Sequence, residues 1–114
     1  MIKIRCGYNE HGNRRAYSEP YCESLEAYFR DDIQGDGEDC IELLEICEKI
    51  QQGELGHWDG TGNAHTVEID REKVSIINEY VPEMHCKISL QEYMDAIKVW
   101  HQFIIDNPPT GGIG

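Results

Sequence analysis

The sequence lacks the long hydrophobic runs of a membrane protein. No apolar stretch approaches the roughly 20 residues that are needed to cross a bilayer. The opening residues, 1–5, contain neither the apolar segment nor the small-residue cleavage site of a secretory leader. We therefore expect a cytoplasmic protein.

Cysteine is present, but without the pattern of a disulfide-bonded or zinc-binding protein. The number of cysteines is odd, and no two are separated by just two residues, as in most structural zinc sites. We expect reduced thiols, in agreement with a cytoplasmic location. A metal site assembled from distant histidines and cysteines stays open. The five cysteines are Cys6, Cys22, Cys40, Cys47 and Cys86.

Positive charge is scarce. The chain has 10 Lys and Arg against 22 Asp and Glu, which gives a formal net charge of −12. This charge repels nucleic acids and anionic membranes, so neither is expected as a direct ligand. It favours a basic protein partner, although surplus acid also serves solubility alone.

The first third of the chain predicts a strand, a loop and a helix. Ile2, Ile4 and Cys6 alternate with basic residues, which is typical of a short strand with one apolar face. Residues 7–18 are polar and are expected to form a loop. A helix is predicted to begin at Pro20, because a missing N–H is tolerated in the first helical turn.

A second helix is predicted after Asp36, whose side chain is suited to cap it. The inward positions recur at helical spacing, at Cys40, Leu43, Leu44, Cys47 and Ile50. The outward face carries the glutamates Glu38, Glu42, Glu45 and Glu48. Gly53 is expected to end this helix.

Between residues 63 and 80 the apolar period changes to two, which predicts a β-hairpin. A two-residue turn at residues 71–72 places the inward positions opposite one another, in the pairs Ile69–Val74, Val67–Ile76 and His65–Asn78. A four-residue loop is the alternative, because Arg-Glu is not a preferred turn sequence. Residues 84–88 are predicted to add another strand.

The last helix has the clearest signals. Ser89 and Glu92 match a capping box. The predicted buried stripe is Leu90, Tyr93, Ile97, Trp100 and Ile104. Together the elements predict an α+β fold, with a small antiparallel β-sheet of three to four strands and about three helices packed on it. We expect a single binding domain over residues 1–114, of which residues 107–114 form a flexible tail.

Catalytic and metal-binding patterns fail at specific residues. Residues 32–43 are similar to a calcium loop, but Leu43 stands where a bidentate glutamate is required. The histidines show no metal-ligand spacing. We therefore expect no catalytic residue, no metal and no cofactor.

His65 is the best single candidate for acid–base chemistry. No second catalytic group is marked near it, so we favour a structural role in which it covers the hairpin edge and bonds to Asn78. The neighbouring Gly60-Thr61-Gly62 precedes a strand and not a helix, which indicates a turn and not a phosphate loop. The chain is predicted not to be an enzyme, with a small hydrolase that uses His65 as the remaining alternative.

The acidic residues are concentrated in one part of the chain. Residues 19–48 hold eleven acids against Arg30 alone, whereas residues 1–18 carry a net positive charge. A solvated face is the ordinary interpretation of such a run. The functional interpretation is a preformed acidic surface that steers a basic protein into contact.

The functional interpretation defines a set of partner-binding residues. It combines acids on and beside the second helix with aromatic residues of the kind that dominate binding energy at interfaces. The predicted set is Asp31, Asp32, Asp36, Glu38, Asp39, Glu42, Glu45, Trp58, Asp59, Glu79 and Tyr80.

Segments of the second half of the chain carry a family resemblance. They are GNAHTVEI at residues 62–69, VSIINEY at 74–80, ISLQEY at 88–93 and WHQF at 100–103. These segments resemble immunity proteins of bacterial contact-dependent growth inhibition systems, in particular those paired with ribonuclease toxins. The resemblance covers residues 60–105, about 40% of the chain. It implies a cytoplasmic protein that binds and blocks one cognate toxin domain, often a tRNA-cleaving nuclease.

Charge and resemblance lead to the same hypothesis. Nuclease active sites are basic because they bind phosphates, so an acidic protein is suited to occupy them. We expect a monomer that binds a toxin nuclease one to one and occludes its basic substrate-binding or active site. The alternative is an acidic adaptor or regulatory binding module without a toxin partner.

Overall fold

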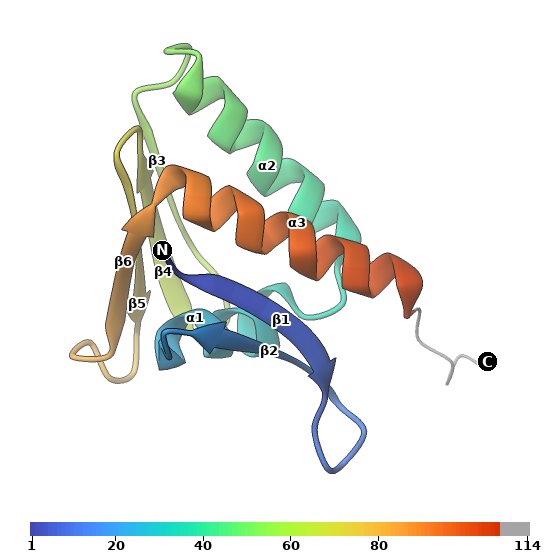
Figure 1. Ribbon diagram of the computed structural model, residues 1–114. Helices are drawn as coiled ribbons and strands as arrows, with labels where there is room; N and C mark the ends of the chain where they lie inside the picture. Colours follow the sequence, from blue (N-terminus) through green and yellow to red (C-terminus); the bar gives the residue numbers. More distant parts are fainter. Residues whose placement is uncertain (108–114) are drawn as a thin grey trace.

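Figure 1 shows the computed structural model, which describes residues 1–107. These residues form a mixed α+β fold with two antiparallel sheets and three α-helices, which confirms the predicted class. The predicted tail, residues 107–114, lies outside the described residues apart from Asn107.

The N-terminal segment forms a two-stranded hairpin. Strand β1 (Lys3–Tyr8) pairs with strand β2 (Arg14–Glu19) in antiparallel register. The prediction of a loop over residues 7–18 is therefore wrong for most of its length. Only Ala16 of β2 is fully buried, so the β2 sequence lacks the apolar alternation that predicts a strand. The strand is defined by its backbone pairing with β1.

Helix α1 (Glu23–Tyr28) begins three residues after Pro20, with Cys22 at its N-cap. It continues into a π-helical turn, η1 (Phe29–Ile33), in which the N–H of Gln34 donates to the carbonyl of Phe29 at 2.8 Å. Both Phe29 and Ile33 of this turn are buried in the core.

Helix α2 (Gly37–Gln51) has the predicted cap and the predicted faces. The Oδ1 atom of Asp36 accepts hydrogen bonds from the N–H groups of Glu38 and Asp39, at 3.0 and 3.2 Å. The buried residues of the helix are Cys40, Leu43, Cys47 and Ile50. The chain leaves the helix at Gly53, which has a φ of +80° that favours glycine.

A four-stranded antiparallel sheet follows, in the order β3-β4-β5-β6. The strands are β3 (His57–Thr61), β4 (His65–Asp70), β5 (Lys73–Asn78) and β6 (His85–Ser89). The pairing of β4 with β5 confirms the predicted register at all three positions, from Ile69–Val74 to His65–Asn78. The two-residue turn is also confirmed, because β4 ends at Asp70 and β5 begins at Lys73. Asp70 Oδ1 accepts the N–H groups of Glu72 and Lys73, each at 2.8 Å.

Strand β3 was not predicted. The Gly60-Thr61-Gly62 segment was interpreted as a turn, whereas Gly60 and Thr61 belong to β3 and only Gly62 lies in the connection to β4. As an edge strand, β3 is defined by its backbone pairing with β4 and needs no apolar alternation.

Helix α3 (Leu90–Asp106) begins with the predicted capping box. Ser89 Oγ accepts the N–H of Glu92 at 3.0 Å, and the N–H of Ser89 donates to Glu92 Oε1 at 2.7 Å. All five residues of the predicted stripe are buried. Helices α1 and α3 lie between the hairpin and the four-stranded sheet, and α2 packs alongside α3 (Figure 1). No helix within residues 1–107 has the length and apolar character needed to cross a membrane.

Candidate protein-binding surface

The outer face of α2 is an unbroken row of four exposed glutamates, which we call the α2 ridge. Its members are Glu38, Glu42, Glu45 and Glu48. In the part of the chain that the structure describes, no Lys, Arg or His lies within 4 Å of these carboxylates. Because the four residues are neighbours at helical spacing, their like charges repel one another. Lys49, in the last turn, is the one basic residue of α2 and forms no ion pair with these glutamates, so the ridge carries a net negative charge.

Three acids of the predicted set on the α2 side of the molecule have partners inside the protein. Asp36 caps α2. Asp31 pairs with Arg30, whose Nε lies 2.8 Å from Asp31 Oδ1, and this guanidinium lowers the pKa of the Asp31 carboxyl. Asp32 is buried beside His65. These side chains have structural roles that the ridge glutamates do not have.

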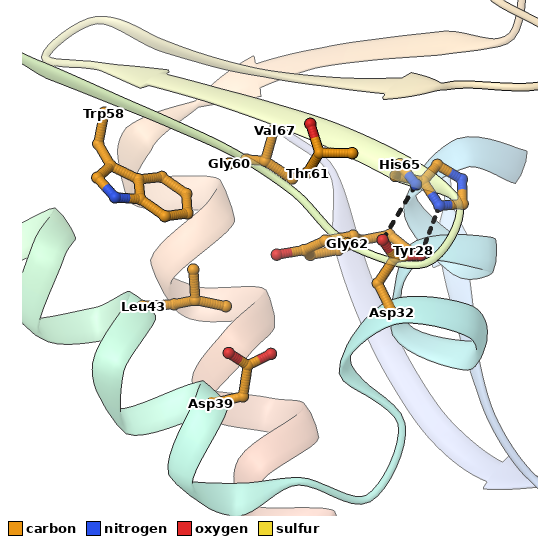
Figure 2. A pocket seen from close by; sticks show the side chains of 10 residues that line it. All are labelled: Tyr28, Asp32, Asp39, Leu43, Trp58, Gly60, Thr61, Gly62, His65 and Val67. Carbon is orange, nitrogen blue, oxygen red and sulfur yellow. Dashed lines mark hydrogen bonds and ion pairs between the residues drawn. The ribbon is translucent and has the colours of Figure 1, made fainter.

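Asp32 and His65 form a buried pair (Figure 2). His65 Nδ1 lies 2.8 Å from Asp32 Oδ1, and the two side chains are 0% and 5% exposed. Asp32 Oδ2 accepts the backbone N–H groups of His65 and Ala64, at 3.0 and 3.3 Å. The carboxylate thus joins η1 to the start of β4, two segments more than thirty residues apart.

The expected partner of His65 was wrong. Its ring bonds to Asp32 and not to Asn78, whose Oδ1 accepts the backbone N–H groups of Tyr80 and Val81. The Nε2 atom of His65 is buried and has no hydrogen-bond partner among the described residues. The Tyr28 ring packs against the imidazole edge to face, with 6.2 Å between ring centroids.

A cavity of about 180 Å³ lies between the first half of α2 and the inner face of β3 and β4. Figure 2 shows Asp39 and Leu43 of α2 pointing across this space toward Trp58 of β3, with Asp32 and Tyr28 at its other end. Its lining residues are Tyr28, Asp32, Asp39, Leu43, Trp58, Gly60, Thr61, Gly62, His65 and Val67. Three members of the predicted set, Asp32, Asp39 and Trp58, therefore meet at one cavity.

The two glycines of the Gly60-Thr61-Gly62 segment are explained by close side-chain approaches. A Cβ atom at Gly60 would lie 2.5 Å from Cη2 of the Trp58 indole, which folds over this position. A Cβ atom at Gly62 would collide with the Asp32 carboxylate. The glycines make room for one aromatic and one acidic wall of the cavity.

Asp39 is the one cavity acid without an internal partner. No hydrogen bond or ion pair to its carboxylate occurs within residues 1–107. Partial burial raises the pKa of Asp39, and the negative charges of Asp36, Glu42 and Asp32 raise it further. The carboxylate is thus held in a negative environment without a neutralising cation.

The remaining predicted residues lie on another face. Along β3, Trp58 and Gly60 face inward, whereas Asp59 points to the outer face of the sheet beside Glu68. Glu79 accepts a hydrogen bond from the Thr66 hydroxyl on that same outer face. Tyr80 is 78% exposed in the connection between β5 and β6. The structure therefore divides the predicted set between the α2 side and the outer side of the sheet.

Sequence reasoning missed Tyr28, Leu43 and Gly60 as cavity residues. Tyr28 and Leu43 follow core periodicity, so nothing local distinguishes them from other core residues. A signal was present at residues 58, 60 and 62, where a tryptophan and two glycines alternate at strand spacing.

Comparisons with known proteins give no assignment. No protein-family model matches the chain, and no curated protein or solved structure is significantly similar to it. Within residues 1–107, no group of three or more His, Cys, Asp and Glu side chains is placed to hold a metal ion. The functional argument therefore depends on the residues of this chain.

Proposed function

We propose that the chain is an immunity-type binding protein that neutralises a basic toxin nuclease by occluding its substrate-binding or active site. The observation that carries the proposal is the α2 ridge, whose four glutamates are exposed and form no ion pair in the described structure. A cytoplasmic location and a one-to-one complex belong to the proposal.

The ridge has no use within the fold. The side chains of its glutamates make no hydrogen bonds among the described residues, and their mutual repulsion lowers the stability of α2. Charge of one sign along a helix raises the rate at which an oppositely charged protein is captured. Fast capture is the property that an inhibitor of a toxic enzyme requires.

A nuclease is the basic partner that fits best. Its active site binds phosphates and carries cationic side chains for that purpose. A rigid row of carboxylates presents similar charge without a cleavable bond. The resemblance of residues 60–105 to immunity proteins supports the same partner class.

The test measures association with the nuclease domain that the proposal expects the upstream gene to encode. A triple reversal on the ridge, Glu38→Lys with Glu42→Lys and Glu45→Lys, is expected to slow association at least tenfold at low salt. The matched control reverses three exposed acids outside the predicted set, with Glu10→Lys, Glu68→Lys and Glu72→Lys, and makes the same change in net charge.

The control distinguishes an effect of the ridge itself on the association rate from an effect of the net charge of the protein. Much slower association for the ridge variant alone supports the proposal, and the difference is expected to shrink as salt rises. Equal rates for the two variants would contradict a role for the ridge. Tight binding without inhibition of RNA cleavage would favour an adaptor.

A further inference from the structure

The cavity beside the α2 ridge has the chemistry of a site for an amphipathic cation. Its walls are apolar and aromatic, with Leu43 and Val67 on two sides and the Trp58 indole on a third. The carboxylates of Asp39 and Asp32 also line it, from opposite sides. Lys and Arg side chains match such a lining, with an aliphatic stem and a charged end.

Only one of the two carboxylates is available to a ligand. Asp32 is 5% exposed, and both of its oxygens accept hydrogen bonds from within the protein. Asp39 is half-buried, points toward the cavity in Figure 2, and has no partner among the described residues. A partly buried carboxylate without a partner is unfavourable, and a bound cation removes this penalty.

The aromatic wall is held in place by the backbone beneath it. The six-membered ring of Trp58 folds over Gly60, where even a methyl group would approach it to 2.5 Å. A guanidinium or ammonium group is attracted to the face of an indole, and this attraction adds to that of a nearby carboxylate. The cavity therefore offers two independent contacts for one cation.

A metal ion fits this cavity less well than an organic cation. No set of three His, Cys, Asp or Glu ligands converges within residues 1–107. The lining beyond the two aspartates is mostly carbon, which a hard metal ion does not use.

We infer that the cavity receives one arginine or lysine side chain from the basic partner, with Asp39 pairing with the charged end and Trp58 covering it. The identity of the partner rests on the proposed function, whereas the cation site is argued from the cavity alone. In the complex, the α2 ridge attracts the partner and the cavity holds a single side chain of it.

The site is tested without the partner, by NMR titration of the whole chain. The probe is N-acetyl-arginine N-methylamide, whose only charge is the guanidinium. The neutral control is N-acetyl-citrulline N-methylamide, which has nearly the same shape. The chain has two tryptophans, so the indole N–H of Trp58 is read directly against that of Trp100, which is 1% exposed and donates to the Gln34 carbonyl at 2.7 Å.

The arginine probe is expected to shift the Trp58 indole and the Gly60 amide in a saturable manner, with a dissociation constant on the order of millimolar. The citrulline probe is expected to shift them much less. Asp39→Asn is expected to weaken the arginine probe about fivefold, the size expected for one partly exposed ion pair. Glu48→Gln, which removes the same charge from the far end of the α2 ridge, is expected to leave it nearly unchanged.

Three results would overturn the inference: no saturable shift of Trp58, equal shifts with both probes, or equal effects of the two variants. With the nuclease domain, Asp39→Asn is expected to speed dissociation about fivefold, whereas Glu48→Gln mainly slows association. If the probe binds but reversal of the ridge leaves association unchanged, the proposed function fails and the cation site stands. If the ridge result holds and the probe does not bind, only the cavity inference fails.

Discussion

The Nδ1 atom of His65 lies 2.8 Å from the Oδ1 atom of Asp32, and neither side chain is accessible enough to serve as part of an open surface. This pair connects the π-helical turn to the central hairpin. It also forms the closed end of the cavity that the α2 helix borders. Asp32, the acid with the most internal hydrogen bonds, and Asp39, whose carboxylate has none among the described residues, thus line the same small space.

Asp32→Ala is expected to lower the free energy of unfolding by about 3 kcal/mol, because it leaves the His65 ring and two backbone N–H groups without their acceptor. Urea denaturation measures the change. Asp31→Ala is the matched control and is expected to cost no more than about 1 kcal/mol, since its pair with Arg30 is partly exposed. Similar losses at the two positions would contradict the structural role of Asp32.

Gly60→Ala is expected to displace the Trp58 indole, because the new methyl group would lie 2.5 Å from Cη2 of that ring. The indole N–H signal of Trp58 is expected to move, and binding of the arginine probe is expected to weaken. Gly56→Ala is the control, since a Cβ atom there meets nothing within 4 Å. An unchanged Trp58 signal in Gly60→Ala would show that the indole does not fold over this position.

Glu42→Gln is expected to raise the free energy of unfolding by about 0.5 kcal/mol, because it removes three like-charge contacts, with Glu38, Asp39 and Glu45. The gain is expected to shrink when sodium chloride is added, since these charges are exposed and are readily screened. Urea denaturation at low and high salt measures both effects. A loss of stability would mean that the ridge stabilises the fold, which removes the argument that its charge serves a partner.

Cys22 is expected to be the most reactive thiol of the described chain at neutral pH. A hydrogen bond from the Cys86 thiol, together with backbone N–H groups at the start of α1, lowers the pKa of Cys22 to about 6. Burial raises the pKa of Cys6 to about 11 and that of Cys40 and Cys47 to about 12. Because the thiolate is the reactive form, alkylation of Cys22 by iodoacetamide is expected to be fast at pH 7 and to slow as the pH falls through about 6.

The hydrogen bond that the Cys86 thiol donates to Cys22 is tested separately. Cys86→Ala removes the hydrogen bond and is expected to raise the pKa of Cys22, so that alkylation at pH 7 slows. Cys86→Ser keeps a donor and is expected to retain more of the reactivity. Peptide mapping by mass spectrometry reads each position separately. Equal rates in the two variants would rule out Cys86 as the cause.

Elements with strong local signals were predictable from the sequence. The register of β4 and β5 follows from the alternation of His65, Val67 and Ile69, because a shift by one residue would expose all three. The cap of α2 at Asp36 and the capping box at Ser89 are also local, since each joins residues within a single turn.

The missed elements depend on contacts that local patterns do not contain. Strand β2 has a single buried residue, Ala16, and β3 contains Gly60 among polar neighbours, so neither shows apolar alternation. Asp32 was assigned to the surface because an acid in a polar stretch ordinarily is exposed. Its burial requires His65, which is 33 positions away. No periodicity reports a tertiary partner at that distance.

The separation between the α2 ridge and the rest of the helix has an evolutionary consequence. The inner residues of α2 are fixed by the core, whereas the ridge glutamates contact nothing on which folding depends. Substitutions in the ridge can therefore accumulate without loss of the fold, and a change of partner requires no new architecture. Under the proposed function, a lineage of such proteins would keep Asp32, His65 and the capped helices while the outer face of one helix diversifies with the toxins it meets.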